Sequence, residues 1–168
     1  MTTLYVDNIA PNLQSKISAP NLTLPAGSVV QTVHFTTGTQ VSTASTSAVV
    51  TNLSGSITPK YSTSHIYVIL HQRVFANPGA GGSAGDWGLE RSTDGGSTFS
   101  QIYVRGRTGL TDNTGGCDVQ ASTMFKDSPA ITTAVNYRTT IRNNGGAGNV
   151  YANLDNALAT MTIMEVAQ

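Results

Sequence analysis

The sequence predicts an all-β fold, an antiparallel β-sandwich, from three observations. Short segments rich in Val, Ile, Thr and Tyr recur along the chain, and Gly-, Asn- and Ser-rich turns separate them. No segment of useful length has a helical period. Thr, Ser and Asn together make up 52 of the 168 residues, and these types favour strands and turns over helices.

The first 26 residues differ from those that follow. Short apolar groups are interrupted by three prolines, which fix the backbone angle φ and lack an N–H donor. We expect an extended N-terminal attachment arm over residues 1–26, ordered by contact with another protein surface, and then a sandwich domain over residues 27–168. The expected attachment residues of the arm are Leu4, Tyr5, Val6 and Ile9.

The expected strands have distinct patterns. Residues 29–36 alternate apolar with polar side chains, whereas residues 41–51 are rich in Ser and Thr, as in an edge strand. Residues 131–142 alternate most cleanly, and residues 159–166 are apolar on both sides. The other expected strands lie at residues 64–75, 87–93, 98–107, 119–125 and 150–154. About nine strands without helices favour a jelly roll or a similar sandwich over an open sheet.

Residues 64–75 form the most informative of these strands. A strand half exposed to water would alternate apolar with polar residues. Here both faces are apolar at the centre: one carries Ile66, Val68, Leu70 and Val74, and the other carries Tyr67, Ile69 and Phe75. Because one sandwich core covers only one face, we expect the second face to be buried against other copies of the chain.

The charge content excludes several classes of partner. Only 11% of the residues are charged, against roughly 25% in ordinary domains, and the formal net charge is zero. Three lysines and no basic stretch interleaved with aromatics argue against nucleic acid. The N-terminus lacks the pattern of a signal peptide, and no apolar run approaches the roughly 18 residues of a membrane span. We therefore expect neither a membrane partner nor secretion.

Residues 92–99, Ser-Thr-Asp-Gly-Gly-Ser-Thr-Phe, match the Asp-box pattern Ser-x-Asp-x-Gly-x-Thr-Trp/Phe. This pattern is found in hairpin turns of sialidases and other β-proteins, where it recurs around a propeller. Here it occurs once, in a chain too short for six blades. Asp94 can accept backbone N–H bonds, Gly95 and Gly96 can take positive φ, and Phe99 can pin the hairpin to the sheet. The motif predicts a hairpin and no glycosidase chemistry.

Residues that could carry chemistry are few. His65 and His71 lie on one face of a strand but about 20 Å apart, too far to share a metal, although each could meet its symmetry mates around a threefold axis. Residues 112–118 do not have the spacing of a calcium loop and read as an Asx-rich turn. Nothing places Asp86 and Glu90 opposite one another for hydrolysis. We expect no enzyme activity, metal or cofactor.

A carbohydrate-binding, lectin-like module is an alternative. Trp87, after a glycine-rich loop, and Tyr103 are candidate ligand contacts that could stack on a sugar. A buried Trp87 that anchors the hairpin is the competing interpretation.

Several short phrases, in this order, resemble small virion proteins of tailed phages, particularly marine ones. They are Thr-Leu-Tyr-Val-Asp-Asn-Ile9, Leu-Pro-Ala-Gly-Ser-Val-Val-Gln31, Ile-Thr-Pro-Lys-Tyr-Ser-Thr-Ser-His-Ile66, Arg-Ser-Thr-Asp-Gly-Gly96, Lys-Asp-Ser-Pro129 and Met-Thr-Ile-Met-Glu-Val166. The resemblance spans nearly the whole chain. It implies a tail-fibre-like or capsid decoration protein, with a domain similar in style to trimeric jelly rolls of the C1q and tumour necrosis factor type.

The resemblance and the strand pattern together predict a function. The expected product is a homotrimeric virion structural protein, with Tyr67, Ile69 and His71 at the trimer interface. It is most simply a capsid decoration or cement protein, anchored through its arm to the major capsid protein. A short tail fibre or receptor-binding tip, joined to a tail or adaptor protein and touching a host surface glycan, is the alternative. Synthesis in the host cytoplasm and location in the virion follow from this interpretation.

Overall fold

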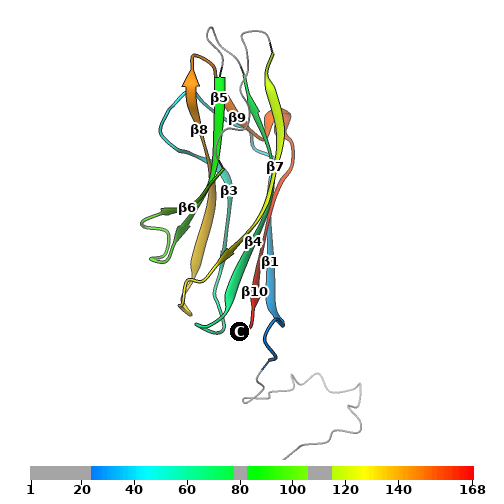
Figure 1. Cartoon of the computed structure of the whole chain (residues 1–168), viewed down its shortest axis with the longest axis vertical. Coiled ribbons are helices and arrows are strands. Elements are labelled where there is room, and N and C mark those ends of the chain that lie inside the picture. Colours follow the sequence, from blue (N-terminus) through cyan, green and yellow to red (C-terminus); the bar gives the residue numbers. More distant parts are fainter. Residues whose placement is uncertain (1–23, 78–82, 106–114) are drawn as a thin grey trace, which may run out of the picture.

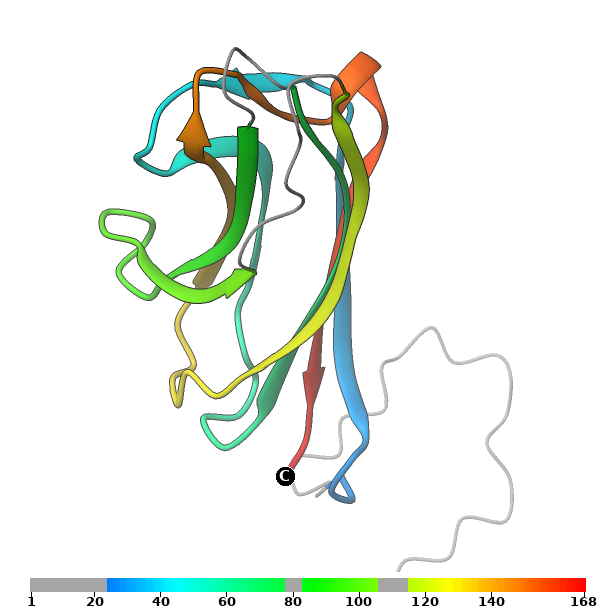
Figure 2. The ribbon, with the colours of Figure 1, turned by 45° about the horizontal axis from the view of Figure 1, so that its top comes forward.

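The computed structural model describes residues 24–77, 83–105 and 115–168. They form ten β-strands and one short 3-10 helix, arranged as two antiparallel sheets packed face to face (Figures 1 and 2). The strands are β1 (Val29–Thr37), β2 (Val41–Thr43), β3 (Val49–Ile57), β4 (His65–Ala76), β5 (Ser83–Ser92), β6 (Ser100–Arg105), β7 (Cys117–Asp127), β8 (Val135–Gly146), β9 (Val150–Ala152) and β10 (Ala159–Val166), with η1 at Leu154–Asn156. The predicted all-β sandwich is confirmed.

The strand order is that of a jelly roll. One sheet runs β1-β10-β4, with β7 on the other edge of β4, and the second runs β3-β8-β5-β6. Strands that are neighbours in a sheet are therefore mostly distant in sequence, because the chain crosses repeatedly between the sheets, as in paired Greek keys. β1 begins at the end of the sandwich where the chain finishes (Figure 1), and the Gly27 N–H donates to the Ala167 carbonyl over 2.9 Å.

Most expected strands are shifted by one to four residues at one or both ends, as from 131–142 to β8 (Val135–Gly146), and one expected strand is split. The Ser/Thr-rich stretch expected at 41–51 is split, because β2 belongs to the six-stranded sheet and β3 to the four-stranded sheet. β9 and β10 are consecutive in sequence, and both pair with β4: β10 pairs with residues 65–71 and β9 with residues 74–76.

The sandwich core uses the predicted face of β4. Ile66, Val68, Leu70 and Val74 are all buried, together with apolar residues of β3, β5, β8 and β10. The centre of this face also holds a polar residue, Gln72, which is fully buried.

Hydrogen bonds satisfy the buried Gln72 amide. Its Oε1 accepts from the Trp87 indole N–H at 2.9 Å, and its Nε2 donates to Thr51 Oγ1 and to Asn153 Oδ1, each at 3.0 Å. A buried polar group without partners costs about 1–3 kcal/mol. The network removes that penalty and fixes the position of β5 over β4.

A second polar cluster joins the two sheets at the side of the core. Asp127, on β7, accepts a hydrogen bond from the Tyr137 hydroxyl of β8 at 2.7 Å and pairs with Arg91 of β5 at 2.7 Å. Burial, followed by the charge of Asp127, raises the pKa of the Tyr137 phenol well above its usual range. The phenol therefore stays a hydrogen-bond donor at any physiological pH.

Candidate functional site

The outer face of the six-stranded sheet is the candidate site. Alternation along β4 places Tyr67, Ile69 and His71 on this face, opposite the core residues. The strand register aligns their neighbours in three cross-strand rows: Thr32–Met164–Tyr67–Lys126, His34–Thr162–Ile69–Met124 and Thr36–Thr160–His71–Ser122. We call Tyr67, Ile69, Met124 and Met164 the apolar face.

Part of the apolar face is open to solvent. Ile69 is 39% exposed and Met124, directly opposite on β7, is 64% exposed. Tyr67 and Met164 are half-buried. A sheet face that meets water normally carries polar residues. The exposed pair of Ile69 on β4 and Met124 on the edge strand β7 therefore indicates a surface suited to contact with a protein.

All three histidines of the chain lie on the same outer face. Nδ1 of His34 is 2.8 Å from Thr162 Oγ1, and Nδ1 of His71 is 2.8 Å from Ser122 Oγ. His65 Nδ1 lies 2.9 Å from Ser128 Oγ. Each ring is thus held by a hydroxyl at the margin of the apolar face. Among the described residues, no group of three His, Cys, Asp or Glu side chains could hold a metal ion.

Charge is concentrated at one end of β4. Arg73 donates to Asp118 through Nη2 at 2.6 Å and to Asp155 through Nη1 at 3.2 Å. The hydrogen bond from Arg73 lowers the pKa of the Asp118 carboxyl, and the hydrogen bond to Asp118 raises the pKa of Arg73. Arg73 and its two carboxylate partners are therefore paired within the chain, and this end of the face does not need a partner protein to neutralise its charge.

The interpretation of Trp87 as an exposed stacking platform is wrong. Trp87 is 1% exposed, because its indole N–H is committed to the core amide of Gln72. Tyr103 is half-buried and packs against Trp87, with ring centroids 6.0 Å apart, and against Phe125 at 5.9 Å. The arm residues Leu4, Tyr5, Val6 and Ile9 lie outside the described residues.

The Asp-box segment forms the predicted turn between β5 and β6. Asp94 accepts the backbone N–H groups of Ser97 and Thr98 at 3.0 Å and the hydroxyls of Ser92 and Thr98 at 2.6 Å. The Ser92 hydroxyl and then Thr98 lower the pKa of the Asp94 carboxyl far below its usual range. Gly95 and Gly96 have positive φ, as expected. The motif is a structural turn.

The two carboxylates weighed for hydrolysis each pair with an arginine. Glu90 accepts from Arg138 at 2.7 Å, and Asp86 pairs with Arg142 at 2.7 Å. They lie four residues apart on β5, each directly opposite its arginine on β8. Both carboxylates therefore act as partners in cross-strand ion pairs.

Sequence reasoning missed Met124 and Met164. The outer positions of β7 read Asp118, Gln120, Ser122, Met124, Lys126, so a single apolar residue among polar ones gave only a weak signal. Met164 was recognised as part of a strand that is apolar on both sides, but its place beside Tyr67 depends on the pairing of β10 with β4. Strand register, which joins distant segments, was the missing information.

Comparisons with known proteins give no family. No family model matches the chain, and no curated protein matches it. Solved structures with related folds include the Yersinia pseudotuberculosis-derived mitogen (13% identity, 82% of this chain and 86% of that chain, TM-score 0.32). A second is the infectious bursal disease virus subviral particle (16%, 92% and 42%, 0.41). A third is Eiger TNF from S. frugiperda (11%, 82% and 94%, 0.37).

This chain spans less than half of the virus chain that it matches, 42% of its length. At these identities and TM-scores, the matches carry no information on activity or partners. Within the described residues, no helix is long and apolar enough to cross a membrane.

Proposed function

We propose that the protein is a non-enzymatic structural subunit of a virus particle that associates with copies of itself through the apolar face. The observation that carries self-association is the exposure of Ile69 on β4 and of Met124 directly opposite it on the edge strand β7. The viral assignment rests on the resemblance of the sequence to tailed-phage virion proteins, and the fold is compatible with it.

Charge supports a second copy of the chain as the partner. The three rows of the outer face contain no carboxylate, and Lys126 at their margin is their only permanent charge. Copies of this face can therefore approach without strong like-charge repulsion. Fully burying a side chain the size of Ile or Met stabilises by roughly 1.5–3 kcal/mol relative to full exposure. Because Ile69 is 39% and Met124 64% exposed in the single chain, each side chain contributes only the corresponding part of that value when copies associate.

The assembly we propose is a homotrimer with Tyr67, Ile69 and His71 in the interface. As a capsid decoration or cement protein it is anchored by Leu4, Tyr5, Val6 and Ile9 to the major capsid protein. A short tail fibre or receptor-binding tip, attached to a tail or adaptor protein, is the alternative station. The low charge and hydroxyl-rich composition suit either position, because both require contact and solubility without strong fields.

Sedimentation equilibrium tests the interface. We expect the unmodified protein to be trimeric and Tyr67→Ser/Ile69→Ser to be a folded monomer. The matched control is Leu158→Ser, because Leu158 is 63% exposed but lies outside the apolar face. A trimer that survives the double substitution would refute the interface, and a monomeric unmodified protein would refute self-association.

Labelled images of particles test the station. Many copies spread over the shell select a decoration protein, and a few copies at the tail select a fibre or tip. Removing residues 1–26 is expected to abolish incorporation into particles and to leave self-association of the domain intact. Normal incorporation of the shortened protein would contradict the role of the arm.

A further inference from the structure

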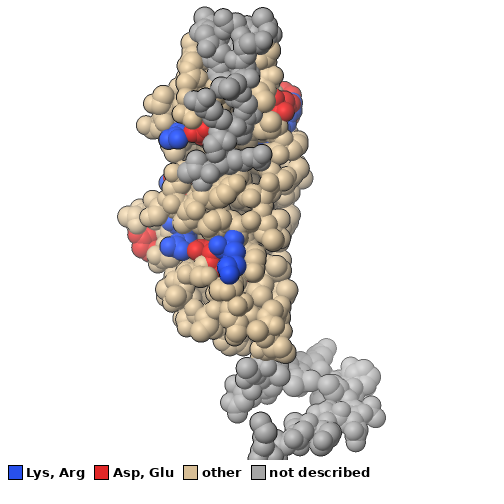
Figure 3. Space-filling model, in the orientation of Figure 1, with Lys and Arg blue, Asp and Glu red and all other residues tan. Residues whose placement is uncertain are grey.

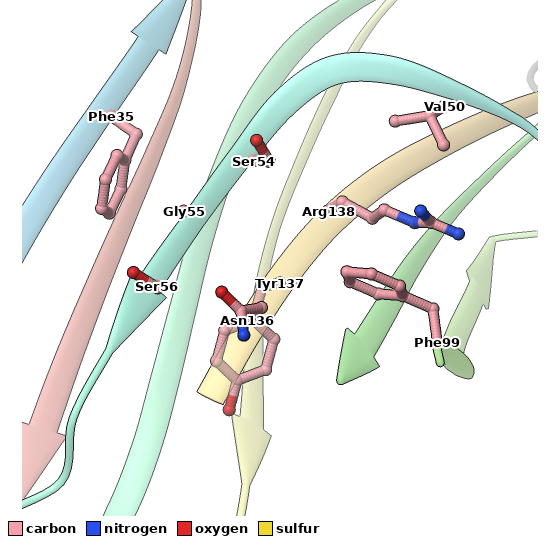
Figure 4. Close-up of a pocket in the computed structure, with 9 residues that line it drawn as sticks. All are labelled: Phe35, Val50, Ser54, Gly55, Ser56, Phe99, Asn136, Tyr137 and Arg138. Atoms are coloured by element: carbon pink, nitrogen blue, oxygen red, sulfur yellow. The ribbon is translucent and has the colours of Figure 1, made fainter. Parts of the chain in front are cut away.

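An open groove lies on the other sheet, over the outer side of β3 and β8 (Figure 4). Its volume is about 440 Å³, within the roughly 300–1,000 Å³ of small-molecule sites. The floor consists of two cross-strand pairs, Ser54 opposite Arg138 and Ser56 opposite Asn136. Phe99, from the Asp-box turn, lies on one side, and Phe35, from β1, lies on the other (Figure 4).

The polar groups of the floor are available to a ligand. In the described part of the chain, no hydrogen bond involves the hydroxyls of Ser54 and Ser56 or the side-chain amide of Asn136. Arg138 donates through Nε to Glu90 at 2.7 Å, and its guanidinium lies over the Phe99 ring at one side of the groove (Figure 4). Two hydroxyls, an amide and a guanidinium thus offer both donors and acceptors.

The aromatic walls are held in place by neighbouring residues. The Arg138 guanidinium lies over the Phe99 ring, 3.7 Å from its centroid, so the ring and the charge fix one another. The Phe35 ring occupies the space where position 55 would carry a Cβ, which would lie 2.2 Å from its Cδ2. Gly55 is therefore required for this wall.

The charge balance selects among ligand classes. Glu90 offsets the positive charge of Arg138, and the described residues that line the groove include no second cation. Recognition of phosphate or nucleic acid would need unpaired basic groups. Neutral hydroxyl-bearing ligands match free hydroxyls and an amide beside phenyl rings, which can pack on the C–H faces of sugar rings. We propose that this groove binds a neutral saccharide.

A peptide strand added to the free edge of β3 is the competing occupant. β3 is an edge strand, but its register with β8 shifts between Val50 and Ser54, and Asn52 within the shift has φ 65°. An irregular edge is a poor template for strand addition. Only the short regular stretch after Ser54 could pair, so the structure favours the saccharide.

The site does not depend on self-association, because the floor of the groove lies on the four-stranded sheet and the apolar face on the outer side of the six-stranded sheet. The groove also places the sugar-binding site of the lectin-like alternative at residues other than those expected from the sequence. The aromatic residues that could contact a sugar are Phe35 and Phe99, and the tryptophan expected in that role is in the core.

Binding to neutral oligosaccharides tests the proposal. An array of gluco-, galacto-, manno- and N-acetylated oligosaccharides is screened with the full chain, and each is titrated into ¹⁵N-labelled protein. We expect at least one to shift the backbone amides of Ser54, Ser56 and Asn136, with a Kd of about 1 mM, as is usual for an open site. Ser54→Ala/Ser56→Ala should raise that Kd about tenfold, the effect of losing one or two hydrogen bonds.

The matched control is Ser42→Ala/Thr46→Ala, which removes two exposed hydroxyls outside the groove and should leave the Kd unchanged. An unaltered amide spectrum away from the substitutions shows that each variant is folded. The proposal is overturned if no oligosaccharide moves the groove amides at about 20 mM, if the serine variant binds as tightly as the unmodified protein, or if only acidic sugars or an extended peptide bind there.

Discussion

The two outward-facing sheet surfaces of the sandwich differ in chemistry. On the four-stranded sheet, outward positions of β5 and β8 carry ion pairs, Arg138 with Glu90 and Arg142 with Asp86. On the six-stranded sheet, outward positions midway along β4 and the edge strand β7 carry Ile69 and Met124, and the charged residues of these two strands lie nearer the strand ends. The few charged side chains visible in Figure 3 accordingly form small groups of mixed sign.

The difference shows that the few charged side chains are distributed unevenly between the two sheet surfaces. The carboxylates on the outer side of the four-stranded sheet pair with arginines of the neighbouring strand, so this surface is suited to contact with water. Its free hydroxyls remain available to a ligand. The six-stranded sheet leaves apolar side chains exposed to water, and this exposure is unfavourable for a single chain. One surface is suited to contact with a small polar molecule and the other to contact with protein.

The largest effect is expected from a charge on the apolar face. Met124→Asp would place an unpaired carboxylate in the proposed interface, where burial without a partner costs several kcal/mol. We expect loss of the oligomer in sedimentation equilibrium, with the melting temperature of the monomer nearly unchanged because Met124 is 64% exposed. Leu158→Asp, at a position 63% exposed, is the control. If Met124→Asp leaves the oligomer as intact as Leu158→Asp does, the apolar face is not the surface through which the copies associate.

The next effect concerns the wall of the groove. Gly55→Ala adds a Cβ that would meet the Phe35 ring at 2.2 Å, so the ring or β3 must move. Overpacking of this kind costs about 1–3 kcal/mol, measured as a lower free energy of unfolding in urea. Gly115→Ala is the control, because a Cβ there meets nothing within 4 Å. Equal stability of the two variants would show that Phe35 does not rely on Gly55.

A smaller effect is expected on the charged sheet. Arg138→Ala removes the partner of Glu90, whose side chain is only 13% exposed, and the cation over Phe99. We expect a loss of about 1–2 kcal/mol in the free energy of unfolding, less than for a fully buried pair. Arg138→Lys keeps the charge but loses the planar stack, so its stability should be intermediate. A lysine variant as unstable as the alanine variant would mean that charge contributes little.

Much of this contrast follows from the sequence. Alternation along β4 predicted both its core face and its outward Tyr67 and Ile69, because a period of two is a local property of the chain. The Asp-box turn was predictable for the same reason, since Asp94 bonds residues within four positions of itself.

What escaped prediction depends on distant pairings. Gln72 occupies a core position, and only the fold brings Trp87 and Asn153 to satisfy it. The groove requires Phe35 and Phe99, which are far apart in sequence, to stand on either side of β3 and β8. Neither the periodicity nor the composition of the sequence indicates such contacts between residues that are distant in the chain.

The smallest effect is a local pH dependence in the Asp-box turn beside the charged sheet. Hydrogen bonds, first from the Ser92 hydroxyl, lower the folded-state pKa of the Asp94 carboxyl. A lowered pKa means that the contribution of Asp94 is fully present above the unfolded value of about 3.9 and is lost as pH falls through the folded value. A ¹³C titration of the carboxyl should therefore have its midpoint well below that of an ordinary aspartate.

Asp94→Asn sharpens this prediction. It should speed amide exchange of Ser97 and Thr98 at neutral pH, because the carboxylate that accepts their N–H bonds is gone. The difference from the unmodified protein should shrink only as the pH falls through the lowered folded-state pKa of Asp94, because protonation then weakens these bonds in the unmodified protein while the asparagine variant does not titrate. A carboxyl midpoint at the ordinary value would show that the turn does not hold Asp94 in its charged form.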